Sequence, residues 1–77
     1  MEIGEYMEND EVKQIIKEIS ASMAKKGYDP VNQIVGYLIS NDLGYIPEFD
    51  DNRKKIAMVD RTLMLEGMLK DYLKWDV

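Results

Sequence analysis

The sequence contains neither cysteine nor histidine. Without cysteine the chain forms no disulfide bond, and without both residue types the usual zinc sites are excluded. The same absences remove the Ser–His and Cys–His pairs of nucleophilic catalysis. No apolar run approaches the roughly 18 residues of a membrane span, and no signal-peptide segment follows the start. We therefore expect a cytoplasmic protein that is not an enzyme, with no catalytic residues, no metal and no cofactor.

A surplus of basic residues, the first sign of nucleic-acid binding, is also missing. The formal net charge is −5, and residues 1–11 hold five acidic residues and no basic one, so the remainder is neutral. Residues 1–8 contain few apolar groups to offset the cost of ordering. The sequence predicts a flexible acidic tail over residues 1–8, followed by a domain over residues 9–77.

The small size of the chain predicts self-association. A single domain of 77 residues buries a modest core, which usually supplies only about 3–5 kcal/mol. Disulfides and zinc are excluded as further sources of stability. A second copy is the remaining common way to bury more apolar surface, so we expect a homodimer that makes no contact with nucleic acid or membrane.

Apolar spacing predicts two helices in the first half of the domain. Residues three or four apart form one apolar stripe in NDEVKQIIKEISASMAKKG and another after Pro30. Gly27 suits a left-handed helix end, Asp29 an N-cap and Pro30 the first helical position. Gly36 lies inside the second helix at a cost of about 1 kcal/mol relative to alanine, so we expect another helix to approach closely there. The stripes comprise Val12, Ile15, Ile16, Ile19 and Met23, and then Val31, Ile34, Val35, Leu38 and Ile39.

The second half contains a long connection and then more helix. Residues 40–52 include four large apolar side chains, at positions 43, 45, 46 and 49, so we expect an ordered loop that lies on the core. After it, the apolar stripe of Ile56, Val59 and Leu63 is followed by a second stripe that is rotated about the helix axis. The second stripe consists of Leu65, Met68, Leu69, Tyr72 and Leu73. Either one long helix is buried on two sides, or two helices meet near Asp60, and we favour the break. The predicted fold is an all-α, compact domain of about four helices.

Two clusters of charged residues are candidate binding sites. Glu48, Asp50 and Asp51 lack the ligand ladder and glycine of an EF-hand loop, so we interpret them as helix caps. The basic residues Arg53, Lys54, Lys55 and Arg61 could approach DNA phosphate if the turn at residues 27–30 were part of a helix-turn-helix. The helix after that turn has no lysine or arginine. We therefore favour a solvated face and keep a small DNA-binding repressor as the alternative function.

Hydroxyl and aromatic residues give weaker signals. No catalytic motif flanks Ser20, Ser22 or Ser40, so we interpret these serines as helix-face or capping residues. Tyrosine and tryptophan are enriched at protein interfaces. We expect the tyrosines at positions 28, 37 and 45 to be partly buried, some of them at a contact between subunits.

Residues 26–47, KGYDPVNQIVGYLISNDLGYIP, resemble the signature of the IreB family, small regulatory proteins of mostly Gram-positive bacteria. The matching segments are GYDP at 27–30, NQIVGYL at 32–38 and the Tyr-Ile pair at 45–46, in the family's order and spacing. The resemblance extends over roughly residues 10–75. The motif residues that form the candidate interface are Gly27, Tyr28, Pro30, Asn32, Gln33, Gly36, Tyr37, Tyr45 and Ile46.

The resemblance implies a helical homodimer without enzymatic activity. It also implies protein–protein interaction in a bacterial cell-envelope signalling pathway, with a PASTA-repeat Ser/Thr kinase as the candidate partner. The resemblance further implies phosphorylation, because the protein that gives the family its name is a substrate of this kinase. Its phosphorylated threonines lie near its N-terminus. Here MEIGEYMENDEV contains neither threonine nor serine, and the one threonine is Thr62. The phosphorylation site is therefore unknown, while Glu2, Glu5 and Glu8 give the tail fixed negative charge.

Overall fold

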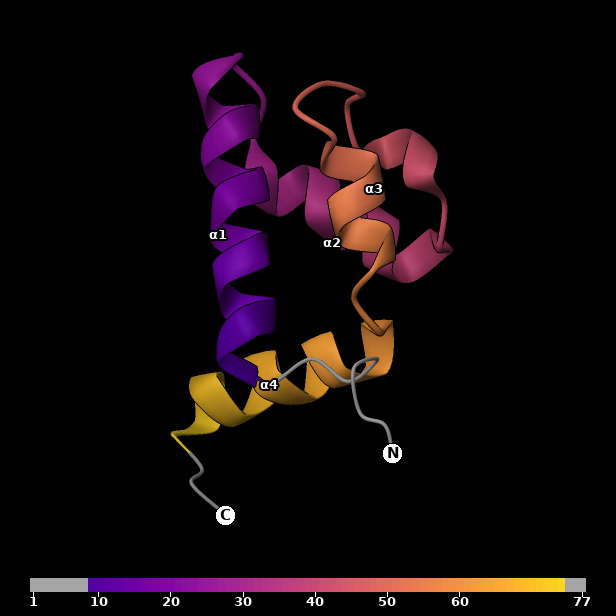
Figure 1. Ribbon diagram of the computed structural model, residues 1–77. Coiled ribbons are helices and arrows are strands. Elements are labelled where there is room, and N and C mark those ends of the chain that lie inside the picture. Colours follow the sequence, from indigo (N-terminus) through magenta and orange to yellow (C-terminus); the bar gives the residue numbers. More distant parts are fainter. Residues whose placement is uncertain (1–8, 75–77) are drawn as a thin grey trace.

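The computed structural model describes residues 9–74, which form four α-helices, one short 3₁₀ turn and no strand. Helix α1 stands along one side, α2, η2 and α3 lie beside it, and α4 crosses the base (Figure 1). The predicted all-α fold of about four helices is confirmed. The predicted tail at residues 1–8 lies outside the described residues. The elements are α1 (Asn9–Lys25), α2 (Pro30–Ser40), η2 (Leu43–Tyr45), α3 (Asn52–Ala57) and α4 (Arg61–Leu73).

The helix boundaries follow the local signals. Gly27 has φ of +89° between α1 and α2, a conformation that favours glycine. The Asp29 side chain accepts hydrogen bonds from the amides of Val31 at 3.1 Å and Asn32 at 3.3 Å. Asp60 accepts likewise from the Thr62 amide at 2.8 Å and caps α4. The predicted break near Asp60 is therefore confirmed.

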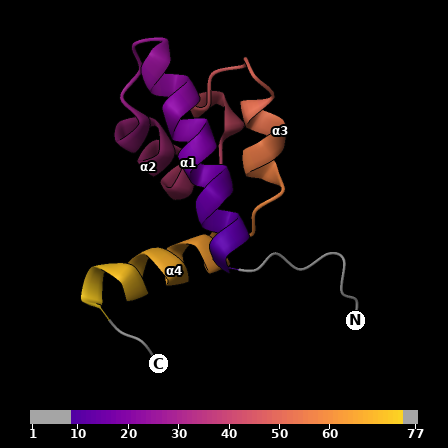
Figure 2. The ribbon, with the colours of Figure 1, turned by 60° about the vertical axis from the view of Figure 1, so that its left-hand side comes forward.

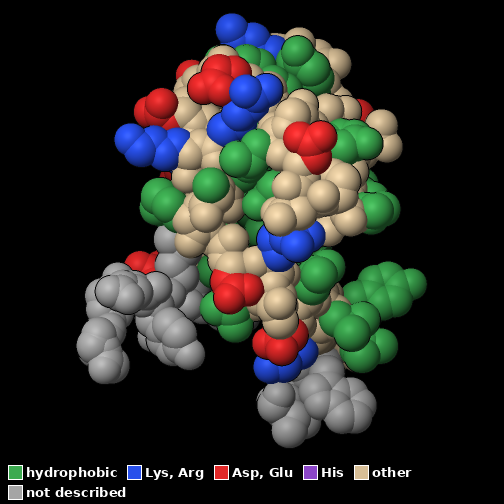
Figure 3. All heavy atoms as spheres, turned by 90° about the vertical axis from the view of Figure 1, so that its right-hand side faces the viewer, with side chains coloured by type: hydrophobic (Ala, Val, Ile, Leu, Met, Phe, Trp, Pro, Cys, Tyr) green, Lys and Arg blue, Asp and Glu red, His purple; other side chains and the backbone are tan. Residues whose placement is uncertain are grey.

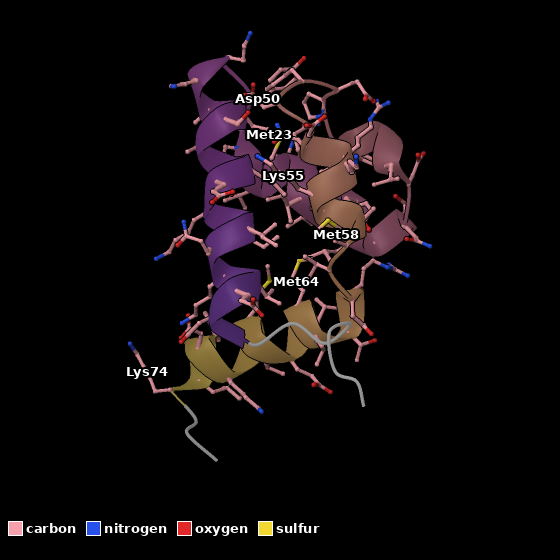
Figure 4. All side chains as sticks on the ribbon, in the orientation of Figure 1. Met23, Asp50, Lys55, Met58, Met64 and Lys74 are labelled. Carbon is pink, nitrogen blue, oxygen red and sulfur yellow. The ribbon has the colours of Figure 1, made fainter. Side chains whose placement is uncertain are left out.

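The core lies where α1, α2 and α3 meet above the start of α4. Helix α1 buries three residues of its predicted stripe, while Ile15 and Ile16 are half-buried at the edge. In Figure 4, Met64 points from α4 toward the helices above it, and it is 2% exposed. The buried hydrophobic residues are Val12, Ile19, Met23, Ile34, Tyr37, Ile46, Ile56, Val59 and Met64.

The stripe of α2 divides between core and surface. Ile34 is buried and Leu38 packs against the core, but the other three predicted residues are exposed. Tyr37 is buried instead. Because apolar residues surround more than half of this short helix, α1 and the following loop cover only part of them.

The connection between α2 and α3 folds back onto the core, as predicted. Ile46 is completely buried, and Phe49 packs against the core cluster. Gly36 has a different role from the predicted one. The ring of Tyr45 from η2 packs directly against Gly36. A Cβ atom at position 36 would lie 2.5 Å from the Tyr45 Cε1 atom, so a larger residue would clash with the ring. The glycine thus admits a loop side chain and not another helix.

Helix α4 is less well covered than the others. Met64 is its only buried residue, and an ion pair joins Lys13 of α1 to Asp71 at 3.7 Å. The helix extends beyond the rest of the molecule (Figure 2). Within residues 9–74, no helix combines the length and hydropathy that a membrane crossing requires.

Candidate functional site

Two polar side chains, Gln33 and Arg53, hold the loop between α2 and α3 by donating three hydrogen bonds to it. Gln33 Nε2 of α2 donates to the Tyr45 carbonyl at 2.7 Å. Arg53 Nε donates to the Ile46 carbonyl at 2.7 Å, and its Nη1 donates to the Glu48 carboxylate at 2.8 Å. These bonds attach η2 and the following residues to both α2 and α3. The loop therefore has a defined position against α2 and α3.

A second arginine supports the end of α2. Arg61 Nη1 donates to the Leu38 carbonyl at 2.7 Å, one of the helix carbonyls that lack a partner within the helix. Both Arg53 and Arg61 are half-buried. The prediction that the basic cluster forms a solvated face was therefore wrong for these two residues. Lys55 lies 3.9 Å from the Glu18 carboxylate, while Lys54 is exposed.

The acidic cluster is divided among separate interactions. Asp50, which Figure 4 shows beside the upper part of α1, accepts a hydrogen bond from Ser22 Oγ at 2.7 Å. The same hydroxyl accepts from Nδ2 of buried Asn52 at 2.9 Å. Asp51 occupies the N-cap of α3 with φ of 57°, but its side chain makes no capping bond, so the predicted cap is only positional. Among residues 9–74, no three His, Cys, Asp or Glu side chains come together as a metal site.

The signature residues have two different roles. Tyr37 and Ile46 are buried at 4% and 0% exposure, and Gly36 lies under the Tyr45 ring. Gln33 makes the loop bond described above, while Gly27 and Pro30 form the corner between α1 and α2. These residues have structural roles. Tyr28, Asn32 and Tyr45 are exposed and are available for contact with another molecule.

Helix α2 also carries an exposed apolar strip that we call the α2 outer face. It consists of Val31, Val35 and Ile39, which are 71%, 45% and 80% exposed. Their spacing of four residues places them on one side of the helix. Helix α2 contains no lysine or arginine. An exposed apolar strip suits a protein contact and lacks the charge that would attract phosphate.

The hydroxyl groups differ in how accessible they are. Ser22 Oγ takes part in the two bonds to Asp50 and Asn52. Ser40 Oγ donates to the Gly36 carbonyl at 2.8 Å and accepts from the Asp42 amide at 3.1 Å. Thr62 is exposed in the first turn of α4. A modifying enzyme would therefore reach Thr62 without breaking a side-chain bond.

Sequence reasoning did not anticipate the bonds that Arg53, Arg61, Ser22 and Asn52 make. The family model described as IreB regulatory phosphoprotein matches residues 3–74 of the 77-residue chain. This chain therefore belongs to the IreB family and has a regulatory role.

Proposed function

We propose that the protein regulates a bacterial Ser/Thr-kinase pathway of the cell envelope by binding other proteins in the cytoplasm, without catalysing a reaction itself. The observation that carries this proposal is the α2 outer face. Its three apolar side chains lie exposed within the family signature, where core packing does not require them. A partner that covers the strip would bury apolar surface that the single chain leaves in water.

The proposed assembly includes a homodimer and a kinase. A second copy would supplement the modest core of this small domain. The kinase would bind at the α2 outer face, with the exposed residues Tyr28 and Asn32 at its edge. Thr62 is the candidate phosphate acceptor, because it is the one threonine of the sequence and is exposed. A phosphate in the first turn of α4 would also suit the positive end of the helix dipole.

The proposal is tested by measuring binding to the purified intracellular domain of a PASTA-repeat kinase. Val35→Asp places a charge in the middle of the α2 outer face, and we expect it to weaken binding by about tenfold or more. Met58→Asp is the matched control, because Met58 is 58% exposed but lies at the end of α3. Unchanged affinity for Val35→Asp would remove the proposed surface. If the wild-type chain shows no binding, the kinase is not the partner.

A further inference from the structure

Helix α4 has two faces, and only one of them is covered. Val12 and Ile16 of α1 line a groove of about 270 Å³ with Met64, Gly67 and Met68 of α4. The other side carries Leu65, Leu69, Tyr72 and Leu73, which we call the α4 outer face. These four residues are 48%, 57%, 85% and 54% exposed. Figure 3 shows hydrophobic side chains gathered at the level of α4.

Helix α4 has 13 residues but buries only one side chain, that of Met64. Isolated helices shorter than about 12–15 residues are marginal in water, and most helical stability in proteins comes from packing of an apolar face. The contact with α1 supplies that packing on one side only. An additional helix against the α4 outer face would supply the rest.

The shape of the α4 outer face indicates what kind of surface it receives. Glu66, Leu69, Lys70 and Leu73 line a shallow hollow of about 290 Å³. Their spacing, with steps of three, one and three residues, is that of the four-residue hole into which a facing helix inserts a side chain. Leucine and tyrosine side chains beside the hollow can serve as such inserting side chains. The face therefore carries both halves of a helix–helix contact.

We infer that the α4 outer face is the contact between two copies of this chain, with the two α4 helices antiparallel about a two-fold axis near Leu69. This inference rests on the homodimer in the proposed function and assigns its interface to α4, away from the signature tyrosines at which the sequence analysis expected a contact between subunits. The axis places Leu65 of one copy opposite Leu73 of the other. It also brings Glu66 near Lys70 of the second copy, twice by symmetry. A two-fold contact needs a surface that is complementary to itself, and these opposite charges beside an apolar centre meet that need.

The absence of native cysteine allows a direct test by cross-linking. A single Leu69→Cys substitution puts one thiol beside the proposed axis, where two copies would place their Cα atoms within about 7 Å, the limit for a disulfide. Met58→Cys is the control, since Met58 is also exposed but is outside α4. Under mild oxidation we expect the Leu69→Cys chain to form covalent dimers roughly tenfold faster or more, owing to the high effective concentration of the paired thiols. Equal rates would overturn the interface.

Light scattering after size exclusion provides the second measurement, with far-UV circular dichroism to confirm folding. We expect Glu66→Lys to weaken the dimer and the double variant Glu66→Lys, Lys70→Glu to restore it, because the exchanged charges again face each other. The α4 interface would be overturned if the wild-type chain is a dimer, both charge variants dimerise equally well, and the Leu69→Cys chain does not cross-link. The proposed homodimer would then still hold. A wild-type monomer at high micromolar concentration would overturn both.

Discussion

Replacing Gly36 with alanine tests the contact between α2 and η2. In an open helix position this change stabilises a protein by about 1 kcal/mol, because glycine is a poor helix former. Here the new Cβ would lie 2.5 Å from Cε1 and 3.0 Å from Cγ of Tyr45. Such overpacking costs about 1–3 kcal/mol. We therefore expect Gly36→Ala to be neutral or to destabilise the protein by up to about 2 kcal/mol.

The magnitude can be isolated in a double-mutant cycle with Tyr45→Ala. Removing the ring leaves the Tyr45 backbone carbonyl free to keep its bond from Gln33, and it opens the space above position 36. Gly36→Ala should then stabilise by about 1 kcal/mol, which gives a coupling of about 1–3 kcal/mol between the two sites. Urea unfolding of all four variants at one protein concentration measures it. The packing argument fails if Gly36→Ala has the same effect with and without the ring.

Three further changes test the network, the caps and α4. Ser22→Ala should destabilise by about 1–3 kcal/mol, because the buried Nδ2 of Asn52 loses its acceptor; an unchanged urea midpoint would refute this. Asp60→Ala should lower stability by about 1 kcal/mol through loss of the α4 cap. By contrast, Asp51→Gly should be neutral or stabilising, since Asp51 has φ of 57° and no capping bond; equal losses at both positions would contradict this. Thr62→Glu should keep the fold and weaken self-association severalfold, because Thr62 lies three residues before Leu65 at the edge of the α4 outer face; an unchanged dimer by light scattering would speak against it.

The helix boundaries could be predicted from the sequence because their signals are local. Gly27, Asp29 and Asp60 act within a few residues of their own position, as left-handed turn and N-caps. The rotation between the two apolar stripes also predicted the break at Asp60. In the structure, Ile56 of α3 is buried, whereas Leu69 of α4 is exposed to water.

The contacts between distant segments could not be predicted in this way. Tyr45 covers Gly36 because of the path that the loop takes, and helical periodicity contains no information about that path. A basic side chain has the same sequence pattern whether it points into water or bonds a backbone carbonyl. Arg61 was therefore predicted to lie on a solvated face, although it donates to the Leu38 carbonyl. The apolar residues of α2 likewise gave no indication that Val35 would be exposed.

The most direct test of kinase control over this chain is incubation with a PASTA-repeat kinase and ATP, followed by peptide mass mapping. We predict one major phosphate, on Thr62, and no such peptide from a Thr62→Val variant. Phosphate on Ser22 would require loss of its bonds to Asp50 and Asn52, so little is expected there. A chain that stays unmodified while the kinase phosphorylates itself would contradict the proposed regulation.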